Sequence, residues 1–568
     1  MTAVTVNRRA KFTRIALVVF PLAFLVAFFY YPLTAIFRDG VIDHSGFTLR
    51  YLGEIAADPY FRDLIGFTIK QALLSTLVSI ALGFPAAYIL TRYDFPFKNA
   101  IRSLTIVPFV LPAITVALGF IIAFGNNGFL NRTLMDLFGV RVRILYSLQG
   151  IVLAHAFYNA PIITRTVHAA WERIDPSYEE SARALGASRF AVFRDVTLRM
   201  LMPGLMSGAL LAFIFSFLSF PIVLALGGAR YSTLEVEIYI QVRTMLNYNL
   251  GAALAIVETF VSLGFAYLYI KAEDRFSLSF PSTRRRRTEP LFAFSPGRIL
   301  VFAFIALNAV IFLGPIFSVV YDSVTRDLAG ERIYTLYWYS FIFSPDYDAI
   351  IGDPPLRSVL NSLSFAAMTA LIAVPLGVAI SVIVRKRGRR QTGLGAVETL
   401  VMAPLAISSV ALGLGLLRAF NRPPLAISGT WVVIVLAHTI LAYPFVIRVV
   451  RPVLESIDRN LIEAGRSLGA SRWRTFFDIE LPLITVAVGV GAVFAFAISI
   501  AEMSAAIMLA RPGLKTMPVT LYHLLAARNF GAASAMGVLL ITITGIAFVL
   551  IEGLGASLLR RGAKAERS

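Results

Sequence analysis

Two similar stretches decide the fold of this chain: Glu180-Ser-Ala-Arg-Ala-Leu-Gly-Ala-Ser-Arg189 and Glu463-Ala-Gly-Arg-Ser-Leu-Gly-Ala-Ser-Arg472. They lie 283 residues apart. Further matches at the same offset are Val152-Leu-Ala-His155 with Val435-Leu-Ala-His438, Pro161 with Pro444, Thr233 with Thr516, and Tyr239 with Tyr522. The chain is therefore a tandem duplication. We expect two halves of equal orientation with a pathway on the axis between them.

The composition around these stretches requires a lipid environment. Of 568 residues, 58% are hydrophobic and 15% charged, whereas soluble domains carry about 25% charged residues. A helix needs about 20 apolar residues to cross a bilayer. Twelve segments meet this length: 15–37, 66–91, 103–124, 148–170, 203–227, 250–270, 299–321, 359–384, 396–417, 430–450, 483–509 and 532–556. We expect an all-α membrane protein of twelve transmembrane helices in two pseudo-symmetric six-helix halves, 1–271 and 299–568.

The basic residues predict the orientation of these spans. The net charge is +19, and most Lys and Arg fall in alternate connections between apolar runs, which by the positive-inside rule places both termini in the cytoplasm. This pattern indicates a multi-pass inner-membrane protein and argues against a nucleic-acid partner. The connection 272–298, with its run Arg284–Arg287, is expected to be a cytoplasmic basic linker beside anionic lipid headgroups.

The two repeated stretches have the signals of a helix–glycine–helix element between the fourth and fifth spans of each half. Asp175 is placed to cap a first helix, and Gly186 to end it in the left-handed conformation. Ser188 is placed to cap a second short helix, on which the spacing of Phe190 and Phe193 predicts a shared face. The second copy repeats these features with Asp458, Gly469, Ser471, Trp473 and Phe476. Such an element suits docking against another protein.

The pattern E-A-A, three residues, then G, with L-P closing the following stretch, resembles the signature loop of binding-protein-dependent ABC importer permeases. In that family the loop is a coupling helix seated in a cytoplasmic ATPase. The resemblance assigns ATPase coupling to Glu180, Ser181, Ala182, Gly186 and Ala187, and to Glu463, Ala464, Gly465, Gly469 and Ala470. Ser181 and Gly465 replace expected alanines. Leu481-Pro482 matches the family, whereas the first copy has Leu198-Arg199.

Permeases with both halves fused in one chain look most like the ferric-iron and thiamine branch of the family. The residues Ser147-Leu-Gln-Gly150, Asn159 and Gly227-Gly228 are similar to those of thiamine-type permeases. The resemblance implies a small cationic substrate, an extracytoplasmic substrate-binding protein and two copies of a cytoplasmic ABC ATPase. The chain contains no G-x-x-x-x-G-K-[ST] phosphate loop. We therefore expect ATP to be used by the partner ATPase, with no cofactor, metal or catalytic residue in this chain.

Ionisable residues inside spans are functional candidates. Glu502 in the eleventh span aligns with Ser219 in the other half. By resemblance this stretch lines the translocation pathway, so Glu502 either faces a cationic substrate or caps or hydrogen-bonds a neighbouring helix. We expect Glu258 to be a packing or interfacial group, and Glu398 to pair with a cytoplasmic arginine.

Two features within the spans are expected to serve helix packing and not a binding or catalytic site. His155 and His438 occupy equivalent positions, and each is expected to donate to a backbone carbonyl and pack rather than bind a metal. The small-residue runs Gly413–Gly415 and Gly489–Gly491 predict close approach of helices.

Three rival classes remain at this point. A secondary transporter with two six-helix halves is favoured only by Arg385–Arg390, which partly matches a loop motif of the major facilitator class. That class gives no role to the duplicated loops. A membrane enzyme lacks supporting motifs such as H-E-x-x-H or G-x-S-x-G, and nothing resembles the selectivity filter of a channel.

Overall fold

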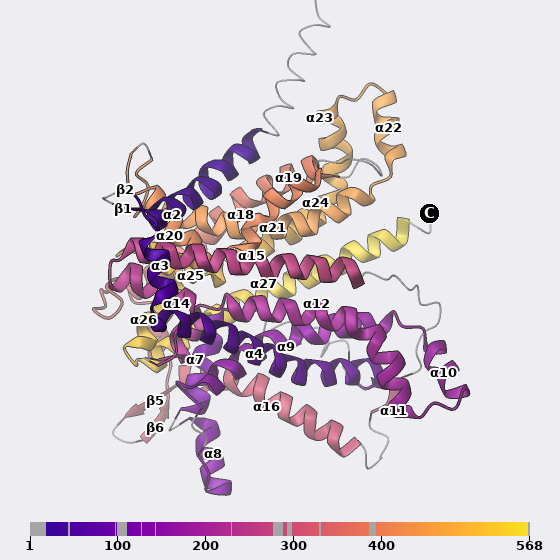
Figure 1. The fold of residues 1–568 in the computed structure, drawn as a ribbon, viewed down its shortest axis with the longest axis horizontal. Coiled ribbons are helices and arrows are strands. Elements are labelled where there is room, and N and C mark those ends of the chain that lie inside the picture. Colours follow the sequence, from indigo (N-terminus) through magenta and orange to yellow (C-terminus); the bar gives the residue numbers. More distant parts are fainter. Residues whose placement is uncertain are drawn as a thin grey trace, which may run out of the picture.

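The computed structural model describes residues 19–43, 46–96, 98, 111–125, 128–141, 144–228, 230–276, 288–291, 298–328, 331–385, 394–423 and 425–565. Within these ranges the chain is nearly all helical (Figure 1). The strands are short and form three two-stranded sheets: β1 (Ile42–Asp43) with β2 (Gly46–Phe47), β3 (Tyr93–Asp94) with β4 (Glu289–Pro290), and β5 (Thr325–Leu328) with β6 (Glu331–Tyr334). The first and third pairs are antiparallel and the second is parallel.

The first part of the chain contains the long helices α4, α9, α12 and α15, joined by shorter elements. Asp58 begins α4, since its side chain accepts a hydrogen bond from the Tyr60 amide at 2.8 Å and Pro59 fits the first helical position. The elements are η1 (Val26–Tyr30), α2 (Tyr31–Val41), α3 (Arg50–Ala57), α4 (Pro59–Arg92), α7 (Ala113–Phe124), α8 (Phe129–Phe138), α9 (Leu148–Glu172), α10 (Pro176–Ala184), α11 (Arg189–Val192), η2 (Phe193–Thr197), α12 (Leu198–Phe217), α13 (Pro221–Leu226), α14 (Leu234–Tyr239), η3 (Ile240–Thr244) and α15 (Tyr248–Phe276).

The second part repeats this order. Its elements are α16 (Arg298–Ser323), α17 (Tyr337–Ile342), α18 (Pro355–Val384), α19 (Leu394–Met402), η4 (Ala403–Ala406), α20 (Ser409–Ala419), α21 (Trp431–Ser456), α22 (Arg459–Ser467), α23 (Arg472–Arg474), η5 (Thr475–Glu480), α24 (Leu481–Ala501), α25 (Ser504–Leu509), α26 (Met517–Ala526) and α27 (Phe530–Ala565). From α9 onward each helix has a counterpart 283 residues later: α9 with α21, α10 with α22, α12 with α24, α13 with α25, α14 with α26 and α15 with α27.

The expected number of twelve spans is not confirmed by the described residues. Among the described residues, nine helices are long and apolar enough to cross a membrane, or ten if one bent pair counts as a single span. The helix α7 has only 12 residues, and residues 103–110 of the predicted third span lie outside the described ranges. The helix α9 has 25 residues, but polar side chains such as His155, Asn159 and His168 lower its hydropathy.

Three predicted spans are also interrupted. The span at 203–227 breaks between α12 and α13, where Pro221 starts a new helix, and the span at 483–509 breaks between α24 and α25 at Glu502. The span at 396–417 bends by 102° between Val397–Ala406 and Ser409–Ala419. Pro404 lies in the tight turn η4 and Ser408 caps the new helix. An apolar run does not reveal such breaks because hydropathy is unchanged across them.

The two parts interlock rather than lie side by side. The helix α2 packs against α20 of the second part, and α16 packs against α7 of the first. Close approach depends on the glycines predicted for it: a Cβ at Gly415 would lie 2.9 Å from the Pro32 carbonyl oxygen, and one at Gly413 would lie 2.8 Å from the Met508 Cβ. The small-residue run on α20 therefore places this helix tightly between α2 and α25.

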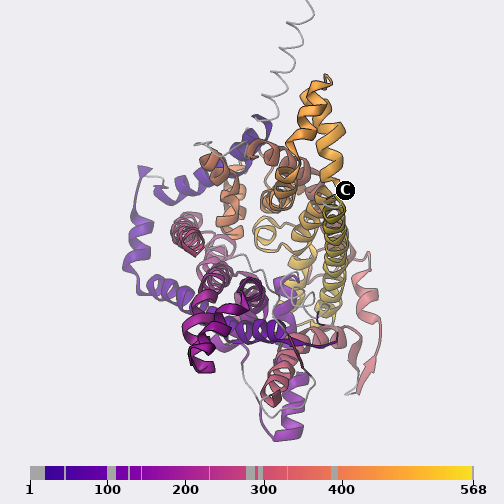
Figure 2. The same ribbon diagram turned by 90° about the vertical axis from the view of Figure 1, so that its right-hand side faces the viewer.

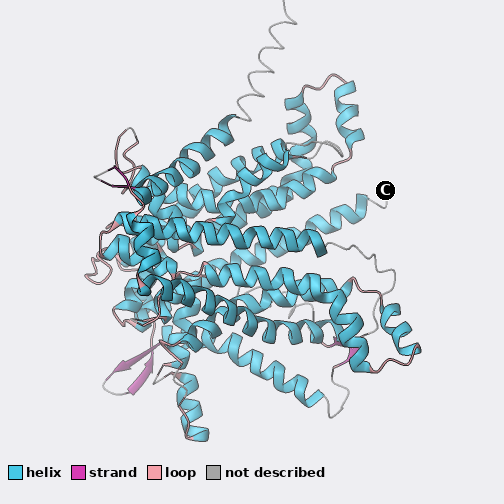
Figure 3. Cartoon of the chain, in the orientation of Figure 1, coloured by secondary structure: helices cyan, strands magenta, loops and turns pink. Residues whose placement is uncertain are grey.

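One end of the helical bundle carries both α10 and α22, and α27 ends on the same side (Figure 1). Seen from that end, the two elements stand apart on the face of the molecule (Figure 2). The β5–β6 hairpin lies at the opposite end (Figure 3). The predicted linker run Arg284–Arg287 and the basic turn after Arg385 lie outside the described residues.

Candidate functional site

The helices α10 and α22 begin as their sequences predict. The Asp175 side chain accepts a hydrogen bond from the Ser177 amide at 2.9 Å, and Asp458 accepts one from the Asn460 amide at 2.9 Å. Ser188 and Ser471 then cap the following turns, accepting from the Ala191 amide at 3.2 Å and the Arg474 amide at 3.3 Å. The helix–glycine–helix geometry is thus confirmed in both copies.

Each first helix ends in a Schellman motif, which satisfies the last carbonyl groups of the helix. In α22 the Gly469 amide donates to the Arg466 carbonyl at 2.9 Å and the Ala470 amide donates to the Gly465 carbonyl at 3.0 Å. The same two bonds occur in α10, from Gly186 to Arg183 and from Ala187 to Ala182. The φ angles of Gly186 and Gly469 are +87° and +84°. Both turns therefore need a residue that tolerates the left-handed region.

The turn presents a leucine to solvent in each copy. Leu185 is 89% exposed and Leu468 is 90% exposed. The same large apolar side chain is exposed at equivalent positions of both copies, which makes these two turns candidate contact surfaces. Leu185 and Leu468 were absent from the predicted coupling residues. They could have been found from the sequence, because they recur at the repeat offset immediately before the predicted glycines.

The predicted aromatic face is wrong for the first copy. Phe190 is 69% exposed, but Phe193 turns inward, with its ring centroid 6.2 Å from that of Phe84 on α4. In the second copy Phe476 also packs against the core, while Trp473 stacks on Phe477 at 5.6 Å. The backbone changes from α-helical to the wider π-helical form at η2 and η5, so i, i+3 spacing no longer places both rings on one face.

The predicted coupling residues lie on and beside these turns. The residues Glu180, Ser181, Gly186, Glu463, Ala464 and Gly469 are exposed, and Ala182, Ala187, Gly465 and Ala470 are half-buried. Gly465 faces η5 closely: a Cβ there would lie 2.6 Å from the Ile479 Cδ1. An alanine at this position would require the end of the Ile479 side chain to shift.

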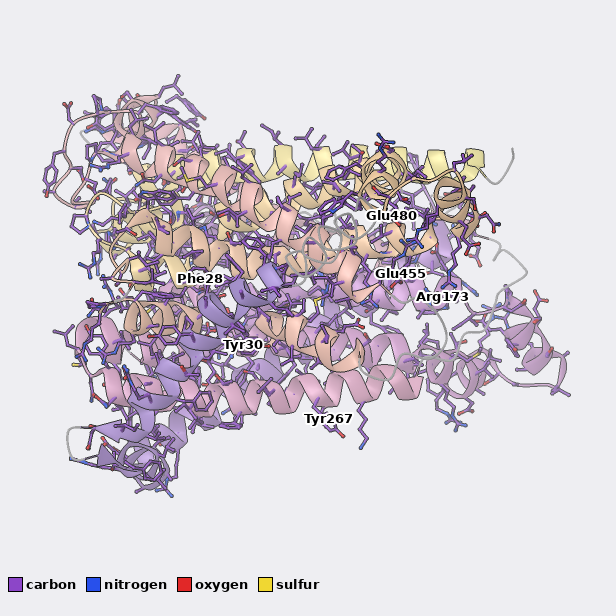
Figure 4. The ribbon with its side chains drawn as sticks, turned by 90° about the horizontal axis from the view of Figure 1, so that it is seen from above. Phe28, Tyr30, Arg173, Tyr267, Glu455 and Glu480 are labelled. Carbon is purple, nitrogen blue, oxygen red and sulfur yellow. The ribbon has the colours of Figure 1, made fainter. Side chains whose placement is uncertain are left out.

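Buried ion pairs, which the sequence did not indicate, tie these elements to the spans. Glu179 on α10 is buried, accepts a hydrogen bond from the Thr197 hydroxyl at 2.9 Å and lies 3.9 Å from Arg92 at the end of α4. In the second copy Arg385, at the end of α18, donates to Glu480 at 2.7 Å. Figure 4 places Glu480 at the end of the bundle that carries α22. Each element is thus linked by a side-chain contact to the end of a long helix.

Glu502 lies at the break between α24 and α25 and is buried. Its two carboxylate oxygens accept hydrogen bonds from the Ala505 amide at 2.8 Å and the Ala506 amide at 2.9 Å, and one of them lies 3.4 Å from the His438 Nε2. The helix-capping role is thus observed directly. Ser219, its counterpart, is buried at the equivalent break between α12 and α13. Both predicted pathway residues therefore mark the interruptions of their spans.

The two histidines are buried but bond to serines, not to backbone carbonyls as expected. The Nδ1 of His155 lies 3.1 Å from the Ser75 hydroxyl, and the Nδ1 of His438 lies 2.7 Å from the Ser499 hydroxyl. Each histidine thus joins helices of its own half.

Two further carboxylates are buried on the neighbouring helices α14 and α15. Glu258, expected to be a packing group, is fully buried on α15, and Glu235 on α14 accepts a hydrogen bond from the Ser408 hydroxyl at 2.7 Å. Sequence reasoning missed Glu235, because α14 is short and its burial depends on α15 and α20. The expected arginine pairing of Glu398 is confirmed, since Arg451 binds it.

One family model matches each half of the duplicated chain. The family model described as "Binding-protein-dependent transport system inner membrane component" matches the chain twice, at residues 79–272 and 373–561. Each match contains one helix–glycine–helix element.

Curated relatives are similar over most of the chain. The ferric transport system permease protein FbpB of Actinobacillus pleuropneumoniae is 26% identical over 91% of this chain and 75% of its own length. The thiamine transport system permease protein ThiP of Brucella abortus is 28% identical over 86% of this chain and 88% of its own length. Among solved structures, a bacterial ABC transporter involved in the import of alginate aligns to 49% of this chain and 100% of its own, with 16% identity and a TM-score of 0.39.

Proposed function

The chain belongs to the binding-protein-dependent transport system inner membrane components and is the permease subunit of an ABC importer, and we propose that it translocates a small cationic substrate, ferric iron or thiamine, delivered by an extracytoplasmic binding protein. Membership in this family sets aside a secondary transporter, a membrane enzyme and a channel. The two candidate substrates come from the relatives, which carry ferric and thiamine transport in their names.

The proposed coupling site is the pair of elements α10 and α22, each receiving one copy of a cytoplasmic ABC ATPase that hydrolyses the ATP. The observation that carries this proposal is the exposed leucine at each turn, Leu185 at 89% and Leu468 at 90%, on two elements at one end of the bundle. An apolar side chain held in solvent by a rigid turn gains free energy when a groove of a partner covers it.

The mechanism we propose is alternating access. Closure of the ATPase pair on ATP would move α10 and α22. Glu179 would transmit this movement to α4 through Arg92, and Glu480 would transmit it to α18 through Arg385. The pathway would then reopen toward the binding protein.

The proposed orientation places both termini and the coupling elements in the cytoplasm. The helices α10 and α22 and the C-terminal end of α27 all lie at one end of the bundle (Figure 1), which supports a single cytoplasmic face. The arginine distribution supports the same side. The proposed halves are residues 1–271 and 299–568, joined by the basic linker 272–298. Ser219 and Glu502 are proposed to line the pathway, because each lies at the break of its span.

The test is affinity purification of the tagged chain from its native membrane in mild detergent, followed by identification of the bound proteins and an ATPase assay. We expect an ABC ATPase at two copies per chain and hydrolysis stimulated by the binding protein. Uptake of labelled thiamine or ferric iron by the reconstituted complex then identifies the substrate. Purification of the chain alone, with solute movement driven by a proton gradient, would refute the proposal.

A further inference from the structure

The helix α8 is an addition to the first half of the duplicated chain. Val116-Ala-Leu-Gly119 on α7 recurs as Val410-Ala-Leu-Gly413 on α20, at an offset of 294 residues, whereas α9 and α21 are related by an offset of 283. The first half therefore has 11 more residues between these elements, and α8 lies among them. In the second half residues 420–430 join α20 to α21, and their described part contains no helix.

Contacts at both ends of α8 define its position. The buried Asn131 donates from its Nδ2 to the carbonyl groups of Phe124 at 2.8 Å and Gly125 at 3.0 Å, which would otherwise stay open at the C-terminal end of α7. Gly139 ends α8 in the left-handed conformation, and its amide donates to the Met135 carbonyl at 2.9 Å. The start of α8 is thus fixed to α7.

The direction of α8 differs from that of the long helices. It extends away from the bundle and across the long helices, near the end that carries the β5–β6 hairpin (Figures 1 and 2). It has ten residues, a length of about 15 Å, which is too short to cross a bilayer. A helix in this direction runs along the plane of the membrane.

The side chains of α8 are divided between an apolar and a charged face. The apolar residues recur at the spacing of one helical face: Leu130, Leu134, Leu137 and Phe138. At the outer end of this face Leu137 is 68% exposed and Phe138 is 71% exposed. Arg132 and Asp136 lie on the opposite face and are also exposed. A helix with one apolar and one charged face is typical of a membrane interface.

The apolar face of α8 continues a surface that faces lipid. A Cβ built at Gly314 on α16 would lie 3.7 Å from the Leu130 Cδ1, so α8 begins beside this helix. The helix α16 is long and apolar enough to cross the membrane, and its large side chains are exposed beside this contact, as at Leu313 and Phe317. Acyl chains that cover α16 would therefore reach α8.

The contact with α16 also gives the depth of α8. Tyr321, near the end of α16, pairs with Tyr334 at a ring distance of 6.3 Å, and the Arg332 guanidinium lies 5.6 Å from the Tyr321 ring. Tyrosines are enriched at the membrane interface. Gly314 precedes Tyr321 by seven residues, or about 10 Å of helix. Amphipathic helices lie about 5–10 Å into the boundary between headgroups and acyl chains, which matches this depth.

We propose that α8 is an interfacial helix that binds the lipid surface of the leaflet opposite α10 and α22. Leu134, Leu137 and Phe138 would lie among the acyl chains, and Arg132 and Asp136 would face the headgroups. Because the second half has no counterpart of α8 in its described residues, this contact would attach the first half alone to the lipid surface. The proposal is independent of the importer function.

The test measures what surrounds each face of α8. The chain has no cysteine, so a single introduced cysteine carries a nitroxide without background labelling. Leu137→Cys and Phe138→Cys report on the apolar face, and Arg132→Cys is the matched control on the charged face. Each variant of the full chain is placed in nanodiscs of phosphatidylethanolamine and phosphatidylglycerol. Power-saturation EPR then gives the collision rates with oxygen, which concentrates in lipid, and with a water-soluble nickel complex.

We expect the ratio of oxygen to nickel collisions to be about fivefold higher at residues 137 and 138 than at residue 132, as for a helix lying in the interface. Leu313→Cys and Leu185→Cys supply the reference values for lipid and for water. Equal exposure of both faces to the nickel complex would place α8 in water, and equal immersion of both faces would place it in the hydrocarbon core. Protection of residues 137 and 138 from both reagents would show that protein covers this face. Each of these three results would overturn the proposal.

Discussion

Replacement of Gly469 tests the coupling role of the second turn. Gly469 has a φ of +84° and a Cβ built on it meets nothing within 4 Å, so alanine adds no clash. The penalty is then conformational only, about 1–2 kcal/mol for an L-residue in the left-handed region. This lowers the population of the native turn by a factor of about 5–30. Proline is incompatible, because it fixes φ near −65° and removes the amide that donates to Arg466 at 2.9 Å.

We therefore expect Gly469→Ala to reduce substrate-stimulated ATPase activity of the purified complex, and Gly469→Pro to abolish it while the protein stays folded in the membrane. The matched control is Gly139, which ends α8 with a φ of +66° and also has open space around its Cβ. Gly139→Ala and Gly139→Pro carry the same local penalty away from α10 and α22 and should leave stimulation unchanged. Full stimulation in Gly469→Pro, or an equal loss in Gly139→Pro, would refute the reasoning. Gly186→Pro, measured beside them, shows whether the first turn contributes equally.

Four further substitutions test other contacts. Leu468→Asp and Leu185→Asp should each lower ATPase co-purification at least tenfold, since burial of a leucine contributes about 1.5–3 kcal/mol; undiminished co-purification would contradict the docking surface. Glu179→Gln, which removes the charge that attracts Arg92, should reduce stimulated hydrolysis several-fold at an unchanged ATPase stoichiometry, and unaltered hydrolysis would argue against transmission through α4. Gly413→Ala should lower the melting temperature, because the new methyl lies 2.8 Å from the Met508 Cβ and overpacking costs about 1–3 kcal/mol. Gly545→Ala is the control, because a Cβ at Gly545 meets nothing within 4 Å, and this variant should not have a lower melting temperature.

Local signals explain what the sequence predicted correctly. Asp175, Gly186 and their counterparts act through bonds to residues two to four positions away, so the pattern alone determines the caps and the Schellman turns. The duplication predicted the shared order of elements. The small-residue run at Gly413 predicted close packing, because only the absence of a side chain permits it.

What the sequence did not predict depends on tertiary contacts. The breaks at Ser219 and Glu502 do not interrupt the apolar runs, so a hydropathy profile does not detect them. The inward turn of Phe193 accompanies a change of helix type at η2. The i, i+3 spacing argument assumes a regular α-helix and therefore does not detect this change. The buried Glu235 was missed because it lies on a six-residue helix, and its burial depends on α15 and α20, which are formed by residues far away in the chain.

Equivalent residues are identical in the turns at the coupling end of the bundle but differ at several buried positions in its interior. At the coupling end, Leu185 and Leu468, and Gly186 and Gly469, are the same residues at equivalent positions, as expected if one ATPase presents the same groove twice. In the interior the buried Glu235 and Glu258 have no acidic counterparts, since Pro518 and Ile541 stand at the equivalent positions. A small substrate has no two-fold axis and needs only one set of charges. Under the proposed function, the duplication would therefore be preserved where a symmetric pair of proteins docks and lost where a single asymmetric substrate passes.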